Sequence, residues 1–111
     1  MDVIDNNGIS IESVYPYEAR DDTCKYTINK YDVTFSRIKF IEQSEDAVQQ
    51  AVATVGPVSA AIDASRYTFQ FYSSGVYDEP YCSSTRHNHA IAIVGYGNLN
   101  GKDYWLVKNS W

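Results

Sequence analysis

The clearest periodic pattern of apolar and polar residues lies in 44–57, SEDAVQQAVATVGP. Ser44 can cap a helix, and the two acids that follow it suit the positive N-terminal end. Gly56 and Pro57 then stop the helix. The apolar residues recur at the spacing of one helix face. They are Ala47, Val48, Ala51, Val52 and Val55. The pattern predicts an amphipathic helix with a buried apolar stripe.

Two apolar runs in the second half of the chain have the length of strands. The run 58–63, VSAAID, is short enough for a buried strand. The run 89–97, HAIAIVGYG, alternates between two sets of apolar residues. One set is Ile91 and Ile93, and the other is Ala92 and Val94. We expect both faces of this strand to be buried.

A hairpin is predicted at the end of the chain. Residues 98–101, NLNG, have the composition of a hairpin turn, and 102–111, KDYWLVKNSW, return as a second strand. Strand pairing brings the two ends of a hairpin together. We therefore expect His89 and Asn109 to be cross-strand neighbours.

The remaining segments give weaker patterns. Residues 31–41, YDVTFSRIKFI, alternate with a change of phase near Ser36 and predict a strand with a bulge. The aromatic-rich segment 65–75 is interpreted as a short helix, and 75–88 as a loop rich in turn formers.

The N-terminal segment predicts little regular structure. Val3 and Ile4 precede Asn-Asn-Gly, which is typical of the last turns of a helix that stops at Gly8. Residues 9–26 mix short extended pieces with Pro16 and paired acids, and we interpret them as a long irregular surface segment.

Composition limits the classes of function. The 111 residues are 44% hydrophobic and 14% aromatic, which is typical of one folded domain or of part of one. The formal net charge is −5, and the nine Lys and Arg residues are dispersed, which argues against nucleic-acid binding. No apolar run approaches the length that spans a bilayer, so we expect no membrane segment.

The two cysteines predict no metal site. Cys24 and Cys82 lie far apart, with neither a C-x-x-C nor a Cys/His metal spacing. They could pair with each other, stay reduced, or pair with cysteines outside this chain. The sequence predicts neither a metal nor a cofactor.

His89 and Asn109 have the chemistry of two parts of a nucleophilic site. A nucleophilic thiol needs a neighbouring imidazole to take its proton, and an amide oxygen can hold that imidazole in one orientation. Trp111 could shield this hydrogen bond from water, or could simply pack in the core. A lone His or a buried Asn is more often structural, so the hypothesis depends on the pair.

Three motifs resemble the C-terminal half of a papain-like cysteine peptidase, closest in pattern to the cathepsin L group. They are GPVSAAIDA, NHAIAIVGYG and YWLVKNSW, and the earlier YPYEA and TCKY resemble the stretch that joins the two halves of that fold. The resemblance implies an α+β fold, with an incomplete, right-hand antiparallel β-barrel-like domain over 33–111. Residues 1–32 would be the end of the segment between the halves. This family contains a Cys-His-Asn triad.

The resemblance implies roles for individual residues. His89 would be the general acid and base, Asn109 its orienting residue and Trp111 the shielding aromatic. Ala61 would be a wall of a substrate pocket, with His87 and Asn88 at its rim. His87 could equally be an exposed loop residue of no consequence.

The same resemblance places the nucleophile outside the chain. Cys24 and Cys82 resemble the structural disulfide positions of the family, with partners outside these residues. The expected partners are therefore a peptide or protein substrate and the missing N-terminal half of the same protein. We expect the isolated chain to be an inactive fragment of a cysteine endopeptidase from a lysosomal, endosomal or secreted compartment.

Two alternatives remain at this point. The chain also resembles silicateins, silica-depositing homologues with Ser as nucleophile, although it lacks their long Ser clusters. A non-catalytic binding homologue is the third possibility.

Overall fold

The computed structural model describes residues 8–27 and 33–111. The chain divides into two compact units, Met1–Phe40 and Ile41–Trp111. The domain boundary after residue 32 that the resemblance implies stays a prediction. The helix end predicted at Val3 and Ile4 lies outside the described residues.

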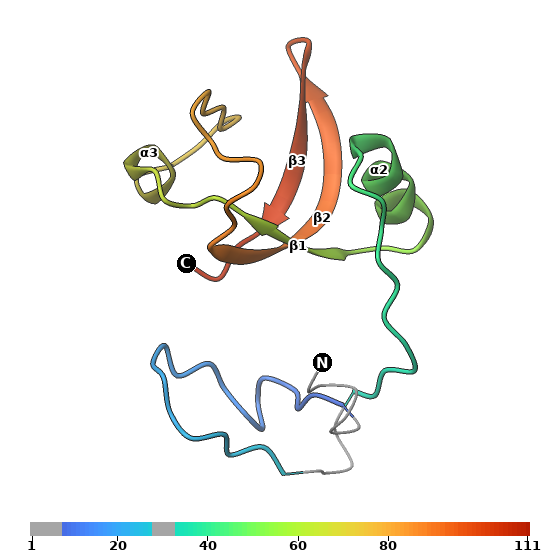
Figure 1. Cartoon of the computed structure of the whole chain (residues 1–111), viewed down its shortest axis with the longest axis vertical. Helices are drawn as coiled ribbons and strands as arrows, with labels where there is room; N and C mark the ends of the chain where they lie inside the picture. The colour runs from blue at the N-terminus through green and yellow to red at the C-terminus, as the bar shows by residue number, and fades with distance from the viewer. Residues whose placement is uncertain (1–7, 28–32) are drawn as a thin grey trace. The chain divides into compact units, whose positions relative to one another are not determined.

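The second unit is built on a three-stranded antiparallel sheet (Figure 1). Its strands are β1 (Val58–Ile62), β2 (His89–Leu99) and β3 (Lys102–Lys108), in the order β1-β2-β3. The antiparallel sheet domain is confirmed, but it is an open sheet and not a closed barrel. Three strands cannot close on themselves, so within the described residues β1 and β3 are edges.

The hairpin between β2 and β3 forms as predicted. Asn100 and Gly101 make its turn, with φ values of 54° and 83°. Two successive positive φ angles define the type I′ turn, whose twist matches that of paired strands. The pairing shifts register between Ile93 and Gly95, which indicates a bulge or irregularity in β2.

Burial in β2 differs from the prediction of two buried faces. Ile91 and Ile93 are 7% and 9% exposed, whereas Val94 is 37% exposed. The strand thus has one buried face, as is common in an antiparallel sheet that is packed on one side only.

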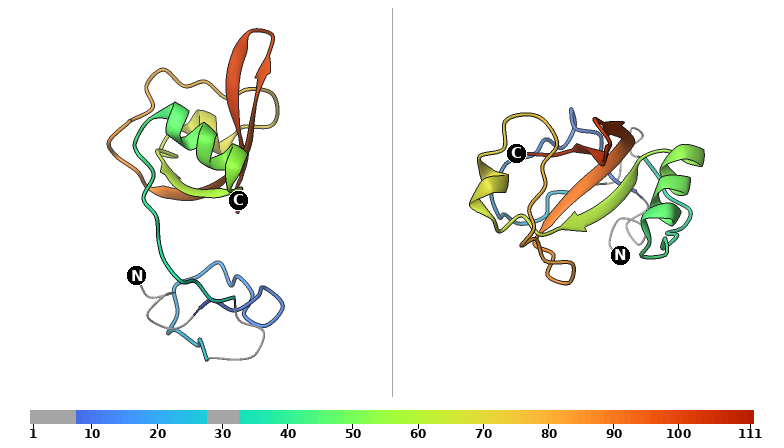
Figure 2. Two further views of the ribbon diagram at one scale, coloured as in Figure 1. Left: turned by 90° about the vertical axis from the view of Figure 1, so that its right-hand side faces the viewer. Right: turned by 90° about the horizontal axis from the view of Figure 1, so that it is seen from above.

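Two helices flank the sheet (Figures 1 and 2), and α2 (Glu45–Thr54) is the one that packs on β1 and β2. Helix α2 is capped as predicted, because the Ser44 hydroxyl accepts from the Ala47 amide at 3.2 Å. Its apolar stripe is only half-buried, and Val55 is 88% exposed because the helix has already ended. The short helix predicted in 65–75 is α3 (Tyr67–Gln70).

The first unit has little regular structure in its described part. An isolated bridge joins Ile9 and Val33, and Gly8 reaches φ 137° where a side chain would meet the Val33 carbonyl. The strand predicted for 31–41 is wrong over its described residues, 33–41. Alternation alone does not make a strand, and in this described segment a bridge partner is present only at Val33.

Candidate active site

His89 and Asn109 meet at the open end of the hairpin. His89 is the first residue of β2, and Asn109 directly follows β3. The Nε2 atom of His89 lies 2.7 Å from Oδ1 of Asn109. Their backbones are not paired, since the pairing of β2 with β3 ends at Ala92 and Lys108. The predicted contact is therefore made by the side chains.

Backbone hydrogen bonds fix which way the Asn109 amide points. Its Oδ1 also accepts from the backbone amides of Ser110 at 2.7 Å and Trp111 at 3.3 Å. These two donors require an acceptor, so the atom facing His89 is the oxygen. Nε2 must then carry the proton that it donates. In a neutral ring, Nδ1 is left as the proton acceptor.

Trp111 covers one side of the His89 imidazole. Its ring centroid lies 4.5 Å from that of His89, at an interplanar angle of 41°. The side chain is otherwise 65% exposed, so the cover is partial. The role of Trp111 as a shielding aromatic stays a prediction.

The predicted substrate residues lie beside His89. Ala61 pairs with Ala90 across β1 and β2, and it is exposed. His87 is exposed in the loop before β2. Asn88 is exposed as well, and its Oδ1 accepts from the Ala64 amide at 2.8 Å. The structure thus gathers these residues around the start of β2, and their role in binding is untested.

Asn88 also joins the loop to the sheet. Its backbone amide donates to the carbonyl of Ile62 at 3.0 Å, and this bond comes one residue before the β1 and β2 pairing begins. The backbone and the side chain of Asn88 are thus both hydrogen-bonded to residues at or just after the end of β1. This fixes the chain direction with which His89 enters β2.

Asp63 is a site-supporting residue that sequence reasoning missed. Among the described residues it is the one buried charged side chain, 7% exposed. Its carboxylate accepts from the amides of Ser65 at 3.0 Å and Ser83 at 2.9 Å. Asp63 therefore ties the loop that leads to His87 and Asn88 to the end of β1. An acid directly after an apolar strand was the signal available in the sequence.

The hydrogen bonds of Asp63 favour its charged form. The Ser65 hydroxyl, the Ser83 amide and the Ser65 amide lower the pKa of Asp63 from 3.8 to about 2, with a smaller contribution from the charge of Arg66. Asp63 therefore stays ionised at any pH at which the protein is expected to work.

The two cysteines lie in different units of the chain. The thiol of Cys82 is within reach of the carbonyl oxygens of Asp63, at 3.8 Å, and Ser83, at 4.0 Å. Within the second unit, the Cys82 thiol is not hydrogen-bonded to His87 or His89. Cys24 and Cys82 are both exposed and unpaired with each other, and they belong to different units. Disulfide partners outside the chain stay a prediction.

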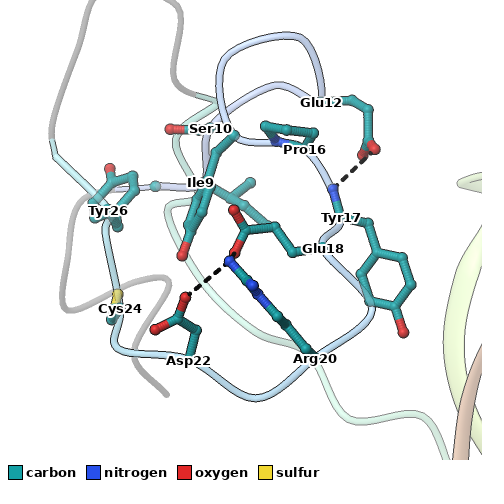
Figure 3. Close-up of a pocket in the computed structure, with 12 residues that line it drawn as sticks. Ile9, Ser10, Glu12, Pro16, Tyr17, Glu18, Arg20, Asp22, Cys24 and Tyr26 are labelled. Carbon is teal, nitrogen blue, oxygen red and sulfur yellow. Dashed lines mark hydrogen bonds and ion pairs between the residues drawn. The ribbon is translucent and has the colours of Figure 1, made fainter.

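A cavity of about 490 Å³ lies in the first unit. Figure 3 shows its charged lining, with Arg20 3.4 Å from Asp22, and Cys24 at its edge. It contains neither His89 nor Asn109. In 8–27 and 33–111 we find no cluster of three potential metal ligands. No helix in these ranges is long and apolar enough to span a bilayer.

Comparison with known proteins gives consistent results. The family model described as papain family cysteine protease matches residues 1–111. The chain is 54% identical over 110 residues to cathepsin S of Mus musculus, covering 98% of the chain and 32% of that protein. It is 52% identical over 107 residues to digestive cysteine proteinase 3 of Homarus americanus, covering 96% of the chain and 33% of that protein.

The fold has a solved counterpart. The structure of digestive procathepsin L2 proteinase from Tenebrio molitor larval midgut matches with a TM-score of 0.85 and 46% identity, covering 98% of the chain and 35% of that protein. The chain thus spans about a third of the length of the relatives that it matches.

Proposed function

The chain belongs to the papain family of cysteine proteases, and we propose that it supplies the histidine and asparagine of a Cys-His-Asn peptidase site. The observation that carries the proposal is the 2.7 Å hydrogen bond between His89 Nε2 and Asn109 Oδ1. This bond leaves Nδ1 as the basic atom. A cysteine outside these 111 residues would face that atom.

The chemistry follows from the free Nδ1 atom. The thiol proton passes to Nδ1 as the sulfur attacks the peptide carbonyl carbon. The C–N bond then breaks, the imidazolium gives its proton to the leaving amine, and a thioester remains. Water next attacks the thioester and gives a proton to Nδ1, and the C–S bond breaks. The released thiolate takes that proton back.

Asn109 acts through His89 in this scheme. Its amide oxygen stabilises the ring orientation in which Nδ1 points away from β3, and it does so without a full negative charge. A carboxylate at this position would favour the imidazolium more strongly and hold the proton that the leaving amine needs.

The substrate is proposed to be a peptide or protein cleaved internally. Ala61, His87 and Asn88 lie beside His89 and are exposed, so a bound chain could reach them. The N-terminal half of the same protein is the proposed partner that completes the site. The proposed compartment is lysosomal, endosomal or secreted, because the relatives include cathepsins and a digestive cysteine proteinase.

Kinetics on the complete protein and on the 111-residue chain test this function. We expect the complete protein to hydrolyse fluorogenic peptides and to lose this activity on alkylation with iodoacetamide. The isolated chain is expected to be inactive at the same molar concentration. Turnover by the isolated chain would contradict the proposal, as would a complete protein whose activity survives alkylation.

A further inference from the structure

The turn between β2 and β3 presents an asparagine followed by a glycine to solvent. Asn100 and Gly101 are its central residues, both exposed, with φ values of 54° and 83°. Among the described residues, nothing beyond the chain neighbours of Gly101 lies within 4 Å of the place that a Cβ would take there. The peptide bond between Asn100 and Gly101 is therefore open to water.

An asparagine in such a place can lose its side-chain amide without an enzyme. The deprotonated backbone nitrogen of Gly101 attacks Cγ of Asn100, and a C–N bond forms. The Cγ–Nδ2 bond then breaks, and the nitrogen leaves as ammonia with the proton that the backbone gave up. Water next opens the cyclic imide at either carbonyl and leaves aspartate or isoaspartate. A glycine hinders the first step least, because it has no Cβ.

The side chain of Asn98 holds the attacking nitrogen. Its Oδ1 accepts from the Gly101 amide at 2.9 Å, and its Nδ2 donates to Oδ1 of Asp103 at 2.7 Å. The carboxylate requires a donor, so the atom that faces Gly101 is the oxygen. The backbones of Asn98 and Asp103 are paired across the hairpin as well. The Gly101 nitrogen must leave this hydrogen bond before it attacks.

We propose that Asn100 is a site of spontaneous deamidation and that Asn98 sets its rate by holding the Gly101 amide. Loss of the Asn98 oxygen would free the nitrogen for attack and loosen the turn. The reaction does not depend on the proposed peptidase function, because His89 and Asn109 lie at the open end of the hairpin and the turn lies at its closed end.

Isoaspartate would alter the hairpin as well as its charge. It adds a methylene group to the backbone between positions 100 and 101, so the pair of positive φ angles that defines a type I′ turn is lost. We expect pairing to loosen between Leu99 and Lys102 beside the turn, and to persist between Ala92 and Lys108 at the other end. Unchanged amide exchange at Leu99 and Lys102 after conversion would contradict this effect.

Two variants and an internal reference separate the role of Asn98 from general lability. Asn98→Ala removes the acceptor of the Gly101 amide. The exchanged pair Asn98→Asp/Asp103→Asn keeps an oxygen facing that amide, a donor facing position 98 and the total charge. Asn7 also precedes a glycine, so its deamidation in the same sample is the reference. Neither variant is expected to change the rate at Asn7.

The measurement follows deamidation in the complete protein, alkylated with iodoacetamide so that it cannot digest itself. After incubation in mildly alkaline buffer, the protein is digested in acid. Mass spectrometry with electron-transfer fragmentation then locates aspartate and isoaspartate. We expect Asn100 to convert in wild type, more slowly than in a synthetic peptide of residues 96–105. The rate should rise by about 2- to 10-fold in Asn98→Ala, which is the effect of one hydrogen bond, and should return to the wild-type value in the exchanged pair.

Three results would overturn the proposal. The first is an intact Asn100 in wild type after an incubation many times longer than the free peptide needs. The second is the same rate at Asn100 in Asn98→Ala and in wild type. The third is a rate in the folded exchanged pair as high as in Asn98→Ala, since the oxygen would then have no effect.

A further variant guards against unfolding, which would also speed the reaction. Slow amide exchange at Ile91 and Ile93 shows that the sheet is intact. If Asn98→Ala loses this protection, Asp103→Ala replaces it, because it keeps Asn98 but removes the carboxylate that orients its amide. A smaller increase at Asn100 is then expected. The wild-type rate in a folded Asp103→Ala protein would overturn the proposal.

Discussion

The two compact units of the chain fix their side chains by different means. In Ile41–Trp111, the register of three strands sets the backbone, and Asp63 and Asn88 tie a loop to the end of β1. In the described part of Met1–Phe40, an isolated bridge and exposed ion pairs hold the chain. His89 and Asn109 both lie in the unit that is fixed by register.

This difference predicts where substitutions have specific effects. A side chain placed by register keeps its neighbours when it is replaced, so a variant in the second unit tests one interaction at a time. Exposed ion pairs are screened by water and salt, so their loss in the first unit should change little.

Replacement of the proposed base should give the largest effect. His89→Ala removes the group that accepts the thiol proton, and we expect kcat of the complete protein to fall by at least about 10²- to 10⁴-fold. Lys25→Ala, an exposed residue of the first unit, is the control and should leave kcat unchanged. Peptide hydrolysis with a fluorogenic substrate measures both. Activity of His89→Ala within tenfold of wild type would show that His89 is not the catalytic base.

The second largest effect should be a difference between the units in how much a substitution lowers the free energy of unfolding. Ile93 lies in the buried face of β2, and Ile93→Ala should lower the free energy of unfolding by about 2–4 kcal/mol, because it leaves a cavity. Phe40 is 88% exposed, and Phe40→Ala should cost about 0.5 kcal/mol or less. Urea unfolding followed by circular dichroism tests this. Equal losses would show that the units are held by similar packing.

Acid should weaken the second unit through Asp63. Its pKa is about 2 in the folded state against an ordinary 3.8, so its charged form stabilises the fold. That contribution is complete above pH 3.8 and is lost as the pH falls toward 2. We expect the melting temperature of the wild type to fall across this window, and that of Asp63→Asn to be lower at neutral pH and to fall less. If the melting temperatures of wild type and Asp63→Asn fell in parallel with pH, the stabilising role of the Asp63 charge would be contradicted.

The ion pairs of the first unit should have the smallest effect. Lys25 lies 2.9 Å from Asp22 and 3.1 Å from Glu18, and these hydrogen bonds raise the pKa of Lys25. Lys25→Met should lower the melting temperature slightly in dilute buffer and not at all in about 0.5 M NaCl, where the Debye length is short. A loss that persists in salt would show that the pair is not screened.

Local signals in the sequence account for the parts of the fold that were predicted. Ser44 and Gly56 mark the ends of α2, and Asn-Gly at 100–101 marks the hairpin turn. These signals act over a few residues and do not depend on the rest of the fold. The hairpin signal was sufficient to predict that His89 and Asn109 lie near each other.

Contacts between distant segments account for what was missed. Asp63 accepts from Ser83, and Phe69 packs on Trp111, and no local pattern predicts either pairing. The strand expected in 31–41 does not form over its described residues, because a strand needs a paired partner and only Val33 has one there. The burial of Val94 was overestimated, because apolar composition does not show which face of a sheet is covered.

Identification of the nucleophile tests the central claim most directly. The complete protein, as wild type and as His89→Ala, would be treated with a peptidyl iodoacetamide and digested, and the alkylated residue would be located by mass spectrometry. The account predicts one rapidly modified cysteine, other than Cys24 and Cys82, whose rapid labelling is lost in His89→Ala. Labelling confined to Cys24 or Cys82 would contradict the account. The absence of any labelling that depends on His89 would also contradict it, and is the result expected for a serine nucleophile or a binding homologue.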